Sequence, residues 1–211
     1  FQPGYLINAA GLYADKVAQS YGFGREFDIL PFKGVYIYGA PREKRPRVHI
    51  YPVPRLSRPW LGVHYTIGVN GQVKIGPTAI PAFWREHYKG FENFHLPEAL
   101  AILRTEAGLF LRNDFEFREI AVEELKKYLR SVLVKQGALL VDGTPMESFR
   151  TWGKPGIRAQ LFHIRERKML MDFVLEGDDA SLHILNAVSP ALTCALPFAE
   201  FVLDEVEARR G

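Results

Sequence analysis

The sequence LNAVSPALTC at residues 185–194 connects an apolar run to a long terminal helix, and this junction decides the fold. The preceding SLHIL, residues 181–185, is apolar and β-branched, which predicts a buried strand. Ser189 is a good N-cap and Pro190 a good first helical residue, because proline lacks the N–H that would be unpaired there. The helix is predicted to run to Arg209. The turn then offers backbone N–H groups to an anion or an electron-rich ring edge, although ordinary packing also produces such turns.

A second junction of the same kind lies near the other end of the chain. YLINAAGLYAD, residues 5–15, changes from an apolar strand through small residues into a helix. An apolar strand covered on both faces normally has neighbours in a parallel sheet. Few candidate neighbours exist in this sequence. We therefore expect that residue 1 is not a natural start and that part of a larger protein lies upstream.

The middle of the chain alternates in the way that antiparallel strands do. Strands are predicted at 34–38, 48–53, 60–67 and 72–76, and Asn70-Gly71 is a strong hairpin signal. Further on, helices are predicted over 97–111, faltering at Gly108, and over 117–135, stopped by Gly137. Residues 157–162 and 169–175 are predicted to pair as a hairpin.

These elements predict an α/β protein with a mixed, largely antiparallel sheet and helices against it. Three segments are expected. Residues 1–29 form a strand, turn and helix of one domain, residues 30–150 form an α+β substrate-binding domain, and residues 151–211 return to the first domain and end in its terminal helix.

Composition excludes several classes of protein. The 211 residues carry 27 Lys and Arg against 24 Asp and Glu, a net charge of +3, which is too balanced to indicate nucleic-acid binding. The basic residues at 42, 44, 45 and 47 cluster around Pro41 and Pro46 and indicate a solvated loop. Cys194 is the single cysteine, which excludes an internal disulfide and a multi-cysteine metal site, and no metal is expected. No apolar run reaches the roughly 18 residues of a membrane span, and no signal peptide is visible.

Eight segments, in order along the chain, resemble one family of flavoproteins. They are INAAGLYADKVA, LPFKGVYIY, HIYPVP, LGVHYT, VKIGPTAIPAFWREHY, PGIRAQ, MDFVL and LHILNAVSPALTCALPFA. In this combination the chain resembles the C-terminal portion of the FAD-dependent L-2-hydroxyglutarate oxidases and dehydrogenases, within the D-amino-acid-oxidase-like group. The resemblance covers nearly all of the chain except about residues 95–150.

The resemblance also implies what this sequence lacks. In that family a G-x-G-x-x-G loop holds the FAD pyrophosphate, and no such motif follows a strand here. We therefore expect partial pieces of a Rossmann-like FAD-binding domain, whose N-terminal half is absent and acts as a partner.

Oxidation of a 2-hydroxy acid needs a base for the hydroxyl proton, while the cofactor accepts the hydride. Histidine suits this role near neutral pH. His64, in GVHYT, is the leading candidate, and a hydrogen-bonded sheet histidine is the alternative. His49 is a weaker rival.

A carboxylate substrate needs cations or hydrogen-bond donors, and the arginine fork fits it best. Arg158 in PGIRAQ is the leading clamp, with a structural salt bridge as the alternative. Lys33 stands where the family usually has Arg, and Val35 stands where it has an acidic residue. Tyr36, Tyr65 and Gln160 complete the expected substrate contacts.

The resemblance assigns the flavin contacts to the two turns. The residues carried over are Ala10, Gly11, Leu12, Asn186, Ala187, Ser189, Pro190, Ala191, Leu192 and Thr193. The expected function is oxidation of an L-2-hydroxy acid, with L-2-hydroxyglutarate first, by hydride transfer to FAD. Amine or amino-acid oxidation within the same group, and a non-catalytic module that binds a small acid, remain alternatives. The electron acceptor is left open, and the expected location is the cytoplasm or the periphery of the inner membrane.

Overall fold

The computed structural model describes residues 3–40, 46–53, 62–188 and 192–211. The chain divides into two compact units, which we name the terminal unit (Phe1–Leu30 and Ala159–Gly211) and the central unit (Pro31–Arg158). The sequence places these boundaries after residues 29 and 150. The mixed α/β class with largely antiparallel strands is confirmed.

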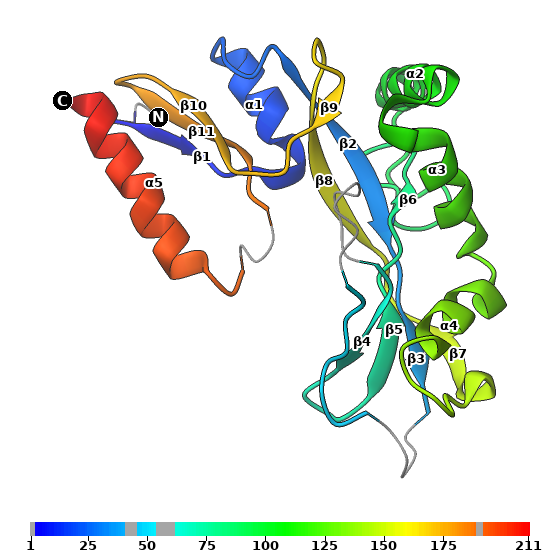
Figure 1. The fold of residues 1–211 in the computed structure, drawn as a ribbon. Coiled ribbons are helices and arrows are strands. Elements are labelled where there is room, and N and C mark those ends of the chain that lie inside the picture. The colour runs from blue at the N-terminus through cyan, green and yellow to red at the C-terminus, as the bar shows by residue number, and fades with distance from the viewer. Residues whose placement is uncertain (1–2, 41–45, 54–61, 189–191) are drawn as a thin grey trace. The chain divides into compact units, whose positions relative to one another are not determined.

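The terminal unit contains a three-stranded sheet in the order β1 (Leu6–Asn8), β11 (Ser181–Asn186), β10 (Val174–Gly177). β1 and β11 are parallel, with Leu6 opposite Ser181, and β10 is antiparallel to β11. Helix α5 (Ala195–Arg210) lies along this sheet (Figure 1). Its Val202 and Val206 are buried together with Leu182 of β11. Burial of this apolar stripe holds the helix on the sheet.

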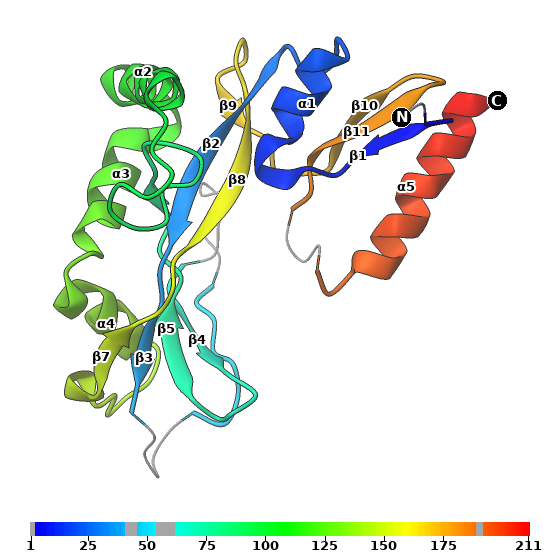
Figure 2. The same ribbon diagram turned by 180° about the vertical axis from the view of Figure 1, so that it is seen from behind.

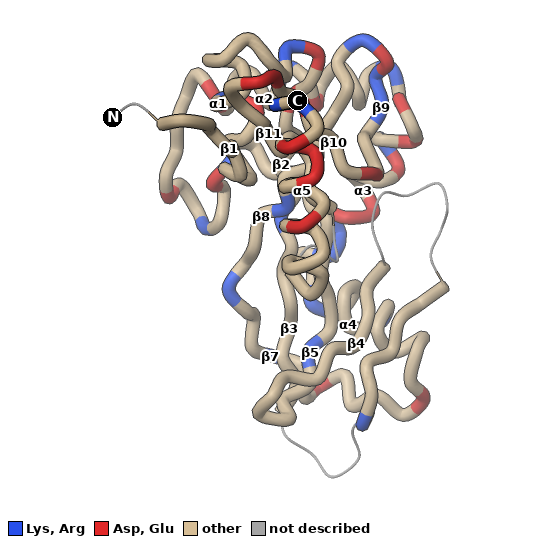
Figure 3. Tube along the Cα trace, turned by 90° about the vertical axis from the view of Figure 1, so that its left-hand side faces the viewer, with Lys and Arg blue, Asp and Glu red and all other residues tan. Residues whose placement is uncertain are grey.

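Figure 3 shows acidic positions, in red on the Cα trace, along α5. Among the described residues, no helix is both long enough and apolar enough to cross a membrane.

The strand and helix predicted at the start of the chain are present. After β1 comes a single 3-10 turn (Gly11–Tyr13) and then α1 (Ala14–Ser20). The helix contributes Ala18 to a core that also contains Phe27, Ile29, Leu161 and Leu185. The strand that precedes α5 therefore packs on the helix that follows β1.

The central unit contains an antiparallel sheet in the order β4 (His64–Ile67), β5 (Val73–Gly76), β3 (Ile37–Gly39), β7 (Phe149–Trp152). The hairpin predicted at Asn70-Gly71 joins β4 to β5, with His64 opposite Gly76. One face of this sheet forms a core with α4 (Arg130–Ala138), as Figure 2 shows. Its buried members include Ile37, Tyr65, Ile75, Leu133 and Phe149. Side chains alternate along strands, so the strand residues next to these core members point to the other face of the sheet.

A further sheet has the order β6 (Ile80–Pro81), β2 (Phe27–Gly34), β8 (Gly156–His163), β9 (Lys168–Met169). β2 and β8 each pass from one unit into the other. The central unit also contains α2 (Leu96–Arg112) and α3 (Phe117–Lys126). α3 packs against β6, and α2 packs against α3.

The prediction of one continuous helix over 117–135 is wrong, because the structure has two helices there. α3 ends at Lys126, Leu129 is extended at ψ 112°, and α4 begins at Arg130. A buried polar contact accompanies the break. Lys127 donates its ammonium to Glu124, whose second carboxylate oxygen accepts the N–H of Ala79 at 2.6 Å.

Three other expectations need correction. α2 continues through Gly108 without faltering. Residues 48–53 form no strand, and only an isolated bridge joins Ile50 to Tyr65. Residues 169–175 do not form one strand paired with 157–162. β9 pairs with β8, whereas β10 pairs with β11.

The terminal helix starts later than expected, at Ala195, with Cys194 in the capping position. The predicted cap at Ser189 and first helical residue at Pro190 lie outside the described residues.

Candidate active site

Both turns implicated by the sequence follow neighbouring strands of the terminal unit. Because β1 and β11 are parallel and adjacent, their carboxyl ends meet at the same edge of the sheet. Ligands of open α/β sheets characteristically bind at this edge. The register therefore brings the start of each turn to one place.

Asn8, the last residue of β1, organises the first turn. Its Oδ1 accepts the N–H of Ala10 at 3.1 Å, and its Nδ2 donates to the carbonyl of Ala14 at 2.8 Å. Nδ2 also lies 3.1 Å from Nδ1 of His183. Since an amide nitrogen can only donate, Nδ1 of His183 accepts and its Nε2 carries the proton, 3.1 Å from Ser181 Oγ. Burial lowers the pKa of His183, which supports this neutral form.

The first turn leaves room for a ligand. Gly11 has φ +54°, and a Cβ built there would meet nothing within 4 Å. Ala10 is exposed, whereas Leu12 packs against the core around Ala18. A glycine with open space beside a fixed turn is a feature that close approach of a flat ring requires. Gly11 therefore has the space that the expected flavin contact would need, whereas the side chain of Leu12 is occupied by core packing.

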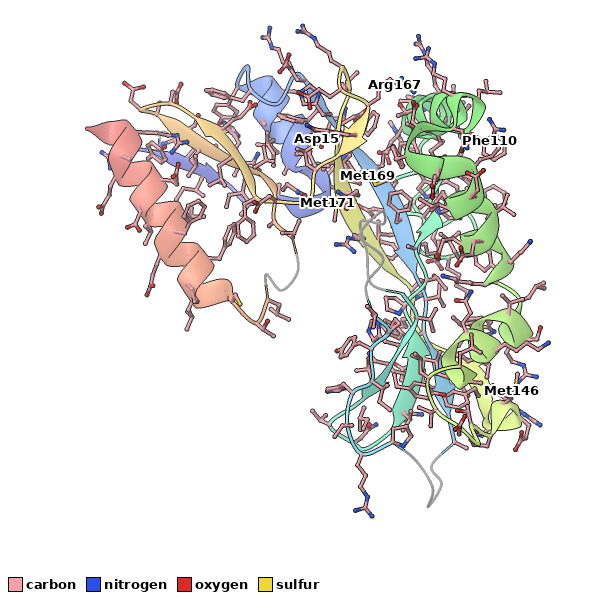
Figure 4. All side chains as sticks on the ribbon, viewed as in Figure 1. Asp15, Phe110, Met146, Arg167, Met169 and Met171 are labelled. Atoms are coloured by element: carbon pink, nitrogen blue, oxygen red, sulfur yellow. The ribbon has the colours of Figure 1, made fainter. Side chains whose placement is uncertain are left out.

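The second turn is described in part. Asn186 ends β11, and its Nδ2 donates to the carbonyls of Leu170 at 3.2 Å and Asp172 at 2.7 Å. Figure 4 labels Met169 and Met171, the residues on either side of Leu170. The side-chain amide of Asn186 is therefore used for hydrogen bonds within the protein, while Ala187 is exposed.

The remaining flavin candidates of the second turn fall into two groups. Ser189, Pro190 and Ala191 lie outside the described residues. Leu192 is 90% exposed, and Thr193 is exposed beside it.

His64 begins β4 in the central unit and is buried to 8% exposure. Its Nδ1 lies 3.0 Å from the carbonyl oxygen of Gly62. A carbonyl can only accept, so Nδ1 carries the proton and Nε2 holds the lone pair. Among the described residues, Nε2 has no hydrogen-bond partner. This is the tautomer that a general base requires.

Burial lowers the pKa of His64, and the nearby charges of Lys74 and His49 lower it further, while the bond to Gly62 acts in the opposite direction. His64 is therefore neutral near pH 7 and able to accept a proton.

Aromatic rings surround His64 on its face of the sheet. The ring of Tyr51 lies 4.5 Å from the His64 ring, centroid to centroid. Gly76 stands opposite His64, and a Cβ there would lie 2.8 Å from Cδ1 of Tyr36. Glycine at φ +143° thus admits the Tyr36 ring against Gly76, the residue that pairs with His64. Burial raises the pKa of Tyr36, and Tyr51 raises it further, so its hydroxyl stays protonated.

Lys74 completes this group, which we name the His64 face: Tyr36, His49, Tyr51, His64 and Lys74. The ammonium of Lys74 lies 4.1 Å from the centroid of the Tyr36 ring. The structure therefore brings two sequence candidates, His64 and Tyr36, onto one surface.

The other substrate candidates lie elsewhere in the structure. Tyr65 points to the opposite face of the sheet, where its ring is in the core and its hydroxyl is 2.7 Å from Thr144 Oγ1. Gln160, in the terminal unit, is buried and donates to the carbonyl of Leu170 at 2.7 Å. Neither shares the His64 face.

Lys33 and Arg158 are cations of the central unit without a hydrogen-bond or ion-pair partner for their charged groups in the described part of the chain. Lys33 is buried on β2, and burial lowers its pKa. Arg158 is half-buried on β8, and its pKa is lowered for the same reason. Both suit an anion, and the structural salt bridge considered for Arg158 is not present among the described residues.

Two residues of the candidate site, Lys74 and Asn8, were not among the site residues predicted from the sequence. Lys74 alternates with buried Val73 and Ile75, which places it on the face opposite the core, and the hairpin register aligns that face with His64. Asn8 was part of the first motif, but its bonds to Ala10 and His183 depend on contact with β11. In the described ranges, no group of three or more His, Cys, Asp or Glu residues is arranged to hold a metal ion.

No family model matches this chain. Curated relatives are nevertheless clear. The chain is 34% identical over 214 residues to the mitochondrial L-2-hydroxyglutarate dehydrogenase of Bos taurus, which covers 97% of this chain and 45% of that protein. It is 33% identical over 209 residues to the L-2-hydroxyglutarate dehydrogenase of Salmonella houtenae, covering 97% and 48%.

A third relative, the L-2-hydroxyglutarate dehydrogenase of Indibacter alkaliphilus, is 36% identical over 200 residues, covering 93% of this chain and 49% of that protein. The chain thus spans about half the length of the curated relatives that it matches.

Proposed function

From the premise that this chain represents a portion of the L-2-hydroxyglutarate dehydrogenase family, we propose that it contributes the substrate base and ring-side cofactor contacts of an FAD-dependent L-2-hydroxy-acid dehydrogenase. L-2-hydroxyglutarate is the substrate that the relatives' names favour, with 2-oxoglutarate as its product. The remainder of the enzyme comes from sequence that relatives possess and this chain does not cover.

The observation that carries the proposal is the state of His64. Its Nδ1–H is bound to the Gly62 carbonyl, its Nε2 is without a partner in the described residues, and its lowered pKa keeps the ring neutral. The ring is also held against Tyr51. A neutral imidazole fixed in one tautomer is prepared to accept a proton from a hydroxyl group.

In the proposed reaction, Nε2 of His64 takes the proton of the C2 hydroxyl as the C2–H bond breaks. The hydroxyl carbon becomes a carbonyl carbon, and the imidazole becomes imidazolium. The protonated hydroxyl of Tyr36 stands on the same face and is available to donate to the substrate oxygen.

FAD, when bound, accepts the hydride that leaves C2. The two turns of the terminal unit fit such a cofactor, because Gly11 has open space beside it and the ends of β1 and β11 share one sheet edge. Asn8 holds Ala10 in position through its Oδ1, and Ala187 adds no bulk at the second turn.

The test uses the protein from the complete reading frame, loaded with FAD and kept without oxygen. L-2-hydroxyglutarate should bleach the flavin absorbance. His64→Asn should slow that bleaching by about 10²- to 10⁴-fold, the usual range for loss of a general base. His95→Asn, at an exposed histidine, serves as the control and should react at the wild-type rate.

Two results would count against the proposal in different ways. Bleaching of His64→Asn at the wild-type rate would remove His64 as the base. Failure of every 2-hydroxy acid to bleach the wild-type protein would remove the function itself.

A further inference from the structure

Lys74 shares the His64 face for a reason set by strand pairing. Gly76 is opposite His64 and Lys74 is opposite Thr66, so Lys74 is a diagonal neighbour of His64. Residues two apart on a strand point to the same face. Diagonal neighbours have Cα atoms about 7–8 Å apart, within reach of a long side chain. One bound molecule can therefore touch both residues.

Within the part of the chain that the structure describes, no acidic group neutralises the charge of Lys74. In the described residues, no Asp or Glu oxygen lies within 4.0 Å of its ammonium, the limit that defines an ion pair. The ring of Tyr36, 4.1 Å away, orients the ammonium but carries no net charge. Lys74 is also partly buried. A partly buried cation gains from an anion that arrives next to it.

The other titratable groups of the His64 face do not supply that anion. Burial raises the pKa of Tyr36, so its phenol stays protonated. His64 is neutral, and the ring of Tyr51 is tilted against it. His49 accepts the N–H of Ile67 at its Nδ1, 3.1 Å away. As far as the described residues show, the His64 face therefore presents a cation without a counter-ion beside a neutral base.

A 2-hydroxy acid has the complementary arrangement, with a carboxylate bonded to the carbon that carries the hydroxyl. We propose that Lys74 binds a carboxylate of the substrate while His64 receives the proton of its hydroxyl. This inference rests on the proposed function and makes Lys74 a specificity-determining residue for anionic substrates.

The experiment compares Lys74→Met and Lys74→Arg in the FAD-loaded protein from the complete reading frame. Lys74→Met should raise KM for L-2-hydroxyglutarate at least tenfold while kcat changes only a few-fold, because the lost interaction is made in the ground state and the transition state alike. Lys74→Arg should restore part of the KM. Lys135→Met, at an exposed lysine of α4, is the matched control and should leave KM unchanged.

Two further readouts separate binding from a structural role. The dissociation constant of 2-oxoglutarate, measured by calorimetry, should rise in Lys74→Met as KM does. The low-pH limb of kcat/KM should move to higher pH, because Lys74 lowers the pKa of His64. A loss of stability alone would change neither. If Lys74→Met does not fold, Lys74→Gln takes its place in every measurement.

Unchanged KM and unchanged 2-oxoglutarate affinity in Lys74→Met, with an active wild-type protein, would overturn the inference and leave the proposed function intact. Equal effects of Lys74→Met and Lys135→Met would also overturn it, since they would reflect general surface charge. A wild-type protein that turns over no 2-hydroxy acid would instead overturn the function on which the inference rests.

Discussion

At the scale of single residues, His64 sets the expected pH dependence of the proposed reaction. Only the neutral imidazole can accept the hydroxyl proton, and burial together with Lys74 and His49 lowers its pKa below the ordinary 6.5. We predict that kcat/KM rises with pH through a single limb centred below 6.5 and is level above it. Initial rates across this range test the prediction, and a limb centred above 6.5 would contradict it.

Glu106 makes the stability of the folded protein depend on pH, and this stability falls as the pH rises. Burial in α2 raises its pKa to about 8, and its Oε1 has no hydrogen-bond partner among the residues that the structure describes. The folded protein then holds a proton that the unfolded chain releases near 4.5, so stability falls as pH rises from 4.5 to about 8. The slope approaches roughly 1 kcal/mol per pH unit.

Glu106→Gln should therefore be more stable than the wild type at pH 8 and nearly equal to it at pH 4.5. Denaturant unfolding at both values measures the difference. Glu98→Gln in the first turn of α2 is not a suitable control, because Glu98 accepts the N–H of Arg85. Glu207→Gln, at an exposed position of α5, is preferable and should show no such slope. A pH-independent gain in Glu106→Gln would show that the carboxyl group is ionised in the folded state.

At the scale of elements, Gly137 shows how a helix and a strand achieve close contact. The sequence predicts that this glycine ends a helix, but it lies inside α4. A Cβ there would be 2.9 Å from Cδ1 and from Cγ2 of Ile75, a fully buried residue of β5. The glycine is required by packing against the sheet and not by a turn.

Gly137→Ala should destabilise the protein by about 1–2 kcal/mol, because overpacking exceeds the gain of nearly 1 kcal/mol in helix propensity. Thermal or denaturant unfolding measures this change. In the double variant with Ile75→Val, the loss should be less than the sum of the two single effects, since Cδ1 is removed. A stabilised Gly137→Ala protein would mean that α4 shifts freely on β5.

The contact at the end of α3 joins the helix to the loop before β6 through one carboxylate. Glu124 accepts from the N–H of Ala79 and from Lys127, and both side chains are buried. Lys127→Met leaves a buried carboxylate without its counter-ion, which should cost about 3–5 kcal/mol. The double variant with Glu124→Gln should recover part of that loss. A change below 1 kcal/mol in Lys127→Met, by denaturant unfolding, would show that solvent compensates Glu124.

Local patterns predicted those elements whose partners are close in the sequence. The hairpin at Asn70-Gly71 was predictable because turn chemistry and alternation act within a dozen residues. The division of residues 117–135 into two helices was not, because the buried contact of Glu124 with Ala79 comes from 45 residues away. The position of Gly108 inside α2 was missed for a related reason, since tertiary packing outweighs the propensity of a single glycine.

At the scale of the whole molecule, the candidate site was predictable where a motif and a strand coincide. His64 and Tyr36 lie on one face because both alternate with core residues of the same sheet. Tyr65 follows His64 directly, and the same alternation puts it on the other face, a consequence available from the sequence. The parallel pairing of β1 with β11 is a contact between the two ends of the chain, and motif order alone does not establish it.

The predicted retention of FAD depends on sequence that the relatives have and that this chain does not cover. In the terminal unit the carboxyl ends of β1 and β11 share one sheet edge, where we propose the ring side of a flavin, but the sequence has no G-x-G-x-x-G loop after a strand to hold a pyrophosphate. The curated relatives are about twice as long as this chain. We predict that the product of the complete reading frame keeps FAD through gel filtration, whereas residues 1–211 expressed alone lose it.

Gly11→Val in the complete protein tests the turn itself. Valine is strained at φ +54°, and its side chain would occupy the open space next to the turn. The FAD content should fall several-fold. Gly90→Val has a matched conformation, φ +50° with nothing within 4 Å, but belongs to the central unit, whereas both turns belong to the terminal unit. It should retain the cofactor at a similar cost in stability. Stoichiometric FAD in residues 1–211 alone would show that the pyrophosphate is held by this chain, and equal loss in both glycine variants would show that backbone strain alone releases the flavin.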